Sequence, residues 1–322
     1  MEEALPMKKI LYLLIFILSI FLLDGCKEQG LNIVIPKASS GELNVRNSQY
    51  TRTIGKHSFG ESDYSTSSPT TQVQQFYVAV DKKDLPSITN ERRVALVIGN
   101  ANYSHGGTLA NPLNDARDMA SMLKSLGFKV MKYEDLGLNE MRRAVDDFGN
   151  MLSKYDVSLF FYAGHGVQVN GNNYLIPVDA KITSKNDVEY NCIEAGRVLS
   201  KMEDAKCKTN LIILDACRNN PFERSWSRGV RLNGGGGLAF MNAPSGSLIA
   251  YSTAPGSTAG DGASGSNGLY TASLLEHMKT PNITIEEMFK RVRVSVEQKS
   301  NRRQIPWEST SLKGHFFFKI EK

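Results

Sequence analysis

Short apolar runs alternate with longer segments of helical periodicity through most of the chain. The runs at 92–100, 157–166 and 210–217 are apolar at successive positions, as expected of strands that are buried on both faces. Segments 113–128 and 139–154 carry apolar residues three and four positions apart, which is typical of amphipathic helices. The same reasoning predicts further strands at 129–135, 246–256 and 314–320, and further helices at 193–204, 270–279 and 284–300.

This alternation predicts the fold class. Strands separated by helices of about ten or more residues form a mainly parallel sheet that is covered by helices on both faces. Residues 91–322 are therefore expected to form one α/β domain. In such sheets, functional side chains gather beyond the carboxyl ends of the strands. The residues that end each predicted strand are the first candidates for chemistry.

The chain before this domain has a different composition. Residues 26–90 are rich in Ser, Thr, Gly, Asn and Gln, most strongly at 62–75. Such a composition predicts a polar, flexible tether. One short strand is expected within it, at 75–80.

An apolar run near the start of the chain follows two lysines. It spans 10–23, about fourteen residues, which is too short to cross a bilayer and fits a signal peptide. The run ends in Leu23-Asp24-Gly25-Cys26, which resembles the lipobox of bacterial lipoproteins. This resemblance implies a signal peptide at 1–25 and lipid on Cys26. An uncleaved membrane anchor is the alternative.

Lys27 follows the cysteine, in place of the aspartate that is associated with retention in the inner membrane. The expected location is therefore the bacterial cell envelope, at the outer membrane or cell surface. Export into an oxidising compartment would leave Cys192, Cys207 and Cys217 after lipidation of Cys26, an odd number of thiols. Cys192 and Cys207 form either a disulfide or two buried small hydrophobic side chains.

Composition narrows the range of partners. The 322-residue chain has a net charge of +5, and 22% of its residues are charged while 41% are hydrophobic. These values are ordinary for a globular protein. Its basic residues are scattered and are not interleaved with aromatic residues, so no nucleic-acid partner is expected.

Candidate chemistry appears at the ends of two predicted strands. His165 ends one strand and Cys217, in "LIILDACRNNP" (211–221), ends another. If the strands are parallel neighbours, both side chains lie at one edge of the sheet, where an imidazole can convert a thiol into a nucleophilic thiolate. The backbone N–H groups of Gly166 and Cys217 are candidate donors to the oxyanion of a reacting carbonyl.

Five motifs resemble the caspase-like cysteine peptidases, in particular bacterial paracaspases and metacaspases. In chain order they are "VALVIGNANY", "LANPLNDARDMASMLKSLGF", "LFFYAGHGVQVNGNNYLIPVDA", "LIILDACRNNPF" and "LIAYSTAPG". The resemblance covers 92 to about 320. It implies a three-layer sandwich around a mostly parallel sheet of about six strands. It also implies a catalytic dyad of His165 and Cys217.

The resemblance further implies an acidic pocket for the side chain before the cleaved bond. Asp215 stands where animal caspases have glutamine, and Asp115 stands in the matching "LNDA" segment. Two carboxylates would attract arginine or lysine and repel aspartate. Asp261 is a candidate third wall. The simpler alternatives are a helix N-terminal charge for Asp115 and a hydrogen-bonded strand-end carboxylate for Asp215.

These features predict a cysteine endopeptidase that cleaves peptides or proteins after Arg or Lys and is held at a membrane by its N-terminal lipid. No cofactor is expected, because no metal-ligand spacing stands out. Some metacaspase relatives bind calcium, but the sequence has no acidic cluster that supports a calcium site. The alternative is a catalytically idle caspase fold that serves as a binding or scaffold module. The glycines of "VIGNANYSHGG" fit no nucleotide-binding motif.

Overall fold

The protein is built around a six-stranded, mostly parallel sheet. The structure, a computed structural model, describes residues 91–217, 238–254 and 265–321, with only the backbone at Cys217. The strands of this sheet are β1 (Arg93–Gly99), β4 (Phe128–Glu134), β5 (Val157–Val169), β8 (Thr209–Cys217), β9 (Ser247–Tyr251) and β10 (Trp307–Thr310). Their order is β10-β9-β8-β5-β1-β4, and only β10 runs antiparallel to its neighbour in this path. The predicted α/β fold with about six central strands is confirmed.

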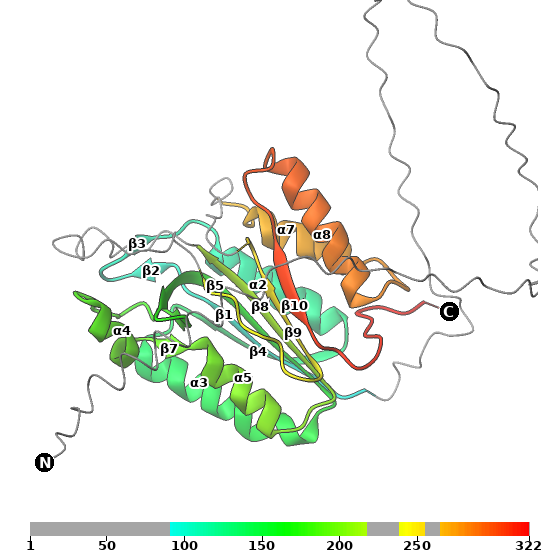
Figure 1. Ribbon diagram of the computed structural model, residues 1–322, viewed down its shortest axis with the longest axis horizontal. Coiled ribbons are helices and arrows are strands. Elements are labelled where there is room, and N and C mark those ends of the chain that lie inside the picture. Colours follow the sequence, from blue (N-terminus) through cyan, green and yellow to red (C-terminus); the bar gives the residue numbers. More distant parts are fainter. Residues whose placement is uncertain (1–90, 218–237, 255–264, 322) are drawn as a thin grey trace, which may run out of the picture. The chain divides into compact units, whose positions relative to one another are not determined.

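Helices cover both faces of this sheet (Figure 1). One layer comprises α2 (Pro112–Ser125), α7 (Leu269–His277) and α8 (Ile285–Lys299), and the other comprises α3 (Leu138–Met151) and α5 (Ala195–Asp204). Alternation along β1 shows why two layers are needed. Ala95 and Val97 pack in the core beneath α2, whereas Leu96 and its even-numbered neighbours pack beneath α3.

Four short strands and a short helix lie outside the central sheet and were not predicted. Strands β2 (Asn102–Tyr103) and β3 (Gly107–Thr108) form a hairpin after β1. Beyond residue 165, β5 continues away from β8 and pairs antiparallel with β6 (Asn172–Leu175), which in turn pairs with β7 (Ile193–Glu194). Helix α4 (Lys185–Asn191) precedes β7.

The predicted strand at 314–320 is wrong. The edge of β9 that faces away from β8 is paired with β10. The aromatic residues that follow β10 therefore have no edge of β9 with which to pair. Phe316 and Phe318 are instead buried in the core beneath α2 and α8 as part of an irregular segment.

The side chain of Arg93 fixes this segment to the first strand. It is 2% exposed, and it donates to the carbonyl oxygens of Phe317 at 3.0 Å and Phe318 at 3.1 Å. Its guanidinium also lies 4.9 Å from the ring centre of Phe316 and forms an ion pair with Glu91. The buried charge is therefore matched by acceptors from both ends of the domain.

The strands that follow β1 along the chain are added to the sheet on opposite sides of β1. The crossover through α2 leads to β4 on one side of β1, and the next crossover leads back to β5 on the other side. In open α/β sheets, such a point opens a crevice at the carboxyl ends of the strands. His165 and Cys217 lie at this end of the sheet, on β5 and β8.

Some predictions concern residues outside the described ranges. These are the signal peptide at 1–25, the lipidated Cys26, the tether at 26–90 with its strand at 75–80, and Asp261. Among the residues that the structure describes, no helix has the length and apolar character that crossing a membrane requires.

Candidate active site

Strands β5 and β8 set His165 directly opposite Cys217. The two strands pair in parallel over nine residue pairs, from Val157 with Thr209 to His165 with Cys217. Neighbouring strands lie about 4.8 Å apart. The structure therefore brings together the backbones of the two residues that the sequence placed at one edge of the sheet.

Two tyrosine hydroxyls hold the backbone of His165. Its N–H donates to Tyr103 Oη at 2.7 Å, and its carbonyl oxygen accepts from Tyr162 Oη at 2.8 Å. The ring of Tyr103 also packs against the imidazole, with the ring centres 4.5 Å apart. His165 itself is only 5% exposed. Neither tyrosine was predicted from the sequence to have this role.

Gly164 permits this arrangement because a side chain has no room there. A Cβ at this position would lie 2.6 Å from Tyr103 Oη and 2.8 Å from Tyr162 Oη. Both distances are far shorter than van der Waals contact. The glycine before His165 therefore allows the two hydroxyls to approach the strand.

Asp115 is held at the start of α2, close to the end of β1. A Cβ at Gly99 would lie 2.4 Å from the carbonyl oxygen of Pro112, so this glycine lets the helix begin directly against the strand. Asp115 is 3% exposed and accepts a hydrogen bond from the N–H of Gly268 at 2.9 Å.

Asp215 reaches the same place from β8. Its Oδ2 accepts from the hydroxyl of Thr271 at 2.7 Å. A Cβ at Gly268 would lie 3.2 Å from Asp115 Oδ2 and 3.5 Å from Asp215 Oδ2, so both carboxyl groups surround this glycine. The structure thus brings the two predicted acids together as an acid pair. The contacts from Gly268 and Thr271, at the start of α7, were not predicted from the sequence.

Comparison with known proteins identifies the family to which this fold belongs. The model of the caspase domain family matches residues 92–317, which is most of the chain. The chain belongs to the caspase domain family. It is therefore a member of a family of cysteine peptidases, as the sequence motifs predicted.

Individual relatives cover the caspase domain to different extents. Human mucosa-associated lymphoid tissue lymphoma translocation protein 1 is 39% identical over 126 residues, which are 39% of this chain and 15% of the human protein. Rat caspase-1 is 24% identical over 248 residues, which are 70% of this chain and 59% of the rat protein. The match thus spans less than two thirds of each relative. The solved structure of caspase-1 from Spodoptera frugiperda has the same fold, with a TM-score of 0.55 and 19% identity, over 76% of this chain and 99% of that one.

The acid pair of this caspase domain has unusual electrostatics. Burial raises the pKa of Asp115 to about 8, and the negative charge of Asp215 contributes to the rise, while the Gly268 N–H and Asn267 oppose it. At neutral pH Asp115 is therefore mostly protonated. A cation placed between the two groups would favour the loss of that proton.

Gly166 of the caspase domain lies where β5 leaves the central sheet. It is opposite Leu175 of β6, and a Cβ there would lie 3.1 Å from Ala216 Cβ and from Leu238 Cδ2. The glycine therefore lets β8 and the segment that starts at Leu238 pack closely beside His165. Its predicted role as an oxyanion donor stays a prediction.

The remaining cysteines and histidines of the caspase domain were not assigned to the proposed site. Cys192 and Cys207 are buried free thiols, and burial raises the pKa of Cys192 to about 12. His105 and His315 are exposed, and His277 Nε2 lies 2.7 Å from Ser295 Oγ. Within the described ranges, no three His, Cys, Asp or Glu side chains are grouped to hold a metal ion.

Proposed function

We propose that this caspase domain is a cysteine endopeptidase that uses a dyad of His165 and Cys217. His165 removes the thiol proton, and the thiolate attacks the carbonyl carbon of the peptide bond while the N–H groups of Gly166 and Cys217 stabilise the oxyanion. The imidazolium then protonates the leaving amine, and water hydrolyses the thioester to release the acid and the thiol. The observation that carries this proposal is the register that pairs His165 with Cys217.

We further propose that the substrate has arginine or lysine before the cleaved bond. The acid pair around Gly268 supports this choice, because a guanidinium or ammonium group would neutralise two carboxyl groups that are otherwise close together. An aspartate side chain would add a third acidic group and be repelled. Asp261, the proposed third wall, lies outside the described residues.

A panel of fluorogenic peptides that differ only at the residue before the cut tests this function. The panel contains arginine, lysine, alanine, aspartate and citrulline, the neutral isostere of arginine. We expect kcat/KM for arginine or lysine to exceed that for citrulline and aspartate by about 100-fold or more, because only a cation neutralises the acid pair. The rates should be equal with EDTA and with added calcium, since each proposed step uses groups of the chain itself.

The control for the panel is Cys217→Ala, which should release fluorophore at least about 1,000-fold more slowly than the wild type from every peptide that the wild type cleaves. Cleavage after aspartate would contradict the proposed specificity and leave the dyad intact. A folded protein that cleaves none of the peptides would contradict the peptidase and favour the binding or scaffold module.

We also propose that the chain is anchored by lipid on Cys26 in a bacterial envelope. The motif Leu23-Asp24-Gly25-Cys26 supports this proposal. Expressed in bacteria with labelled palmitate, the full chain should take up label and partition into detergent, whereas Cys26→Ser should do neither. Label that persists in Cys26→Ser would contradict lipidation at this residue. A mature mass that still includes residues 1–25 would indicate an uncleaved anchor.

A further inference from the structure

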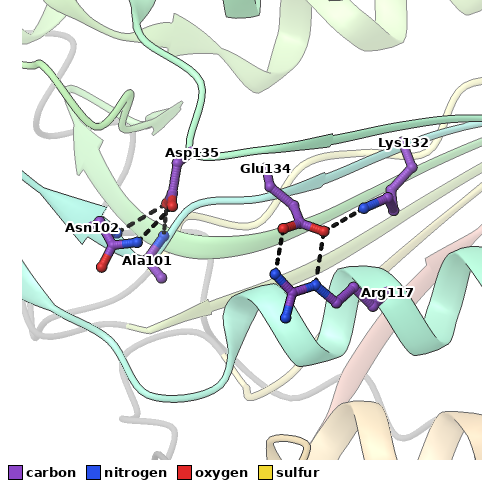
Figure 2. Close-up of polar contacts among 6 residues, drawn as sticks. All are labelled: Ala101, Asn102, Arg117, Lys132, Glu134 and Asp135. Carbon is purple, nitrogen blue, oxygen red and sulfur yellow. Dashed lines mark hydrogen bonds and ion pairs between the residues drawn. The ribbon is translucent and has the colours of Figure 1, made fainter.

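The loop that follows β1 is held by the carboxylate of Asp135, which lies just after β4. Asp135 Oδ1 accepts from the backbone N–H groups of Ala101 at 2.8 Å and Asn102 at 3.0 Å. Its Oδ2 accepts from Asn102 Nδ2 at 2.6 Å, and its own N–H donates to the carbonyl oxygen of Gly99 at 2.9 Å. Figure 2 shows the carboxylate facing these donors. One side chain therefore fixes the backbone immediately before Tyr103.

The preceding residue, Glu134, gives a natural comparison. Its carboxylate forms a two-pronged ion pair with Arg117 and a second ion pair with Lys132 (Figure 2). Arg117 is 53% exposed, and these partners of the Glu134 carboxylate lie on α2 and β4. Two neighbouring carboxylates thus have separate roles, one toward α2 and one toward the loop.

The position of Tyr103 matters because β1 ends before β5 does. The last ladder pair between these strands is Gly99 with Ala163, and the N–H of Asn100 donates to the carbonyl oxygen of Ala163 at 2.9 Å. Beyond this point β1 offers no backbone acceptor to the N–H of His165. The hydroxyl of Tyr103 takes that place at 2.7 Å.

Tyr162 completes the arrangement from β5 itself. Its hydroxyl lies 3.3 Å from Tyr103 Oη and donates to the carbonyl oxygen of His165 at 2.8 Å. The backbone N–H and C=O of His165 are therefore both bound by tyrosine hydroxyls that also contact each other. A small movement of Tyr103 would consequently shift the backbone of His165. It would also move the ring against which the His165 imidazole packs.

We infer that Tyr103, held in place by Asp135, is a positioning residue that orients the His165 imidazole toward Cys217. This inference rests on the proposed function, because it assigns His165 the role of base. Tyr103 would touch neither the substrate nor the reacting atoms through its hydroxyl, which binds the backbone of His165. Displacing a catalytic group by about 1 Å can lower the rate of a reaction by about 100-fold.

Tyr103→Phe in the full chain is the main test. This change keeps the ring and removes the acceptor, so the N–H of His165 loses its partner. We expect kcat to fall by about 10–100-fold while KM stays within about twofold of the wild type. We also expect the pH profile for alkylation of Cys217 by iodoacetamide, mapped by peptide mass, to move to higher pH, because a displaced imidazole stabilises the thiolate less well.

Matched variants separate positioning from a general loss of structure. Tyr251→Phe removes another buried hydroxyl that accepts from a backbone N–H, that of Met241 at 3.0 Å. Asp135→Asn should move kcat and the alkylation profile in the same direction as Tyr103→Phe. Tyr251→Phe and Glu134→Gln should leave both measurements unchanged.

The outcomes distinguish the inference from the proposed function. A kcat for Tyr103→Phe within twofold of the wild type would overturn the inference, as would an equal fall in Tyr251→Phe. A lower kcat with an unchanged alkylation profile would assign Tyr103 a structural role only, and would also overturn it. If the wild type cleaves no peptide, the proposed function fails, but the alkylation profiles of the wild type and Tyr103→Phe still decide whether Tyr103 positions the ring.

Discussion

Replacing Cys217 by alanine is expected to lower kcat on an arginine peptide by about three orders of magnitude or more, and His165→Ala should have a similar effect. A neutral thiol is a weak nucleophile, and without the imidazole little thiolate forms at neutral pH. Steady-state rates on the best peptide of the panel, with unfolding midpoints to verify the fold, provide the measurement.

The double variant sharpens this prediction. Because the two groups act as a unit, Cys217→Ala with His165→Ala should be no slower than either single variant. Cys207→Ala is the matched control, since Cys207 is a buried free thiol whose sulfur lies 3.5 Å from the carbonyl oxygen of Leu152. If the fold-decrease in kcat of the double variant equals the product of the two single decreases, the two residues act independently, which would contradict a dyad.

Asp115→Asn is expected to stabilise the fold at neutral pH and to lower kcat/KM for arginine peptides by about 100-fold. The pKa of Asp115 is raised from 3.8 to about 8. Between these values the folded chain keeps a proton that the unfolded chain has lost, so stability falls as pH rises through this window. Asparagine removes that dependence and still offers an oxygen to the Gly268 N–H. We expect a gain of about 1–3 kcal/mol in the free energy of unfolding at pH 7.

Urea unfolding at pH 5, 7 and 8.5 measures this effect, and the difference between variant and wild type should grow with pH. The kcat/KM of the wild type for arginine peptides should rise toward pH 8, as Asp115 ionises, more steeply than for citrulline peptides. Asp147→Asn, at an exposed acid of α3 on the opposite face of the sheet, is the control and should change neither property. A variant less stable than the wild type at every pH would contradict this account of the acid pair.

Strands buried on both faces were the most predictable part of the fold. β1, β5 and β8 are continuous apolar runs, which do not resemble amphipathic helices, and their ends placed His165 and Cys217 at the edge of the sheet. β10 was missed because it is short and partly exposed at the edge of the sheet, so it has no burial pattern. The aromatic run after it favours a strand locally, but no strand edge was left for it.

Hydrogen bonds between side chains and backbone groups that are far apart in the sequence could not be predicted. Asp115 and Asp215 were identified through family motifs, whereas the Gly268 N–H that binds Asp115 lies 153 positions further along the chain. Tyr103 similarly binds a backbone group 62 positions away. A hydrogen bond to a main-chain group places no requirement on the type of residue there, so it leaves no pattern to detect.

The link between Arg93 and the carbonyl groups of Phe317 and Phe318 has a consequence for biosynthesis. Arg93 is among the first residues of the domain to leave the ribosome, and its acceptors are among the last. Until they emerge, the Arg93 guanidinium lacks these two acceptors, and burying it with too few hydrogen-bond partners is strongly unfavourable. The nascent domain therefore gains its full stability only after Phe317 and Phe318 have left the ribosome.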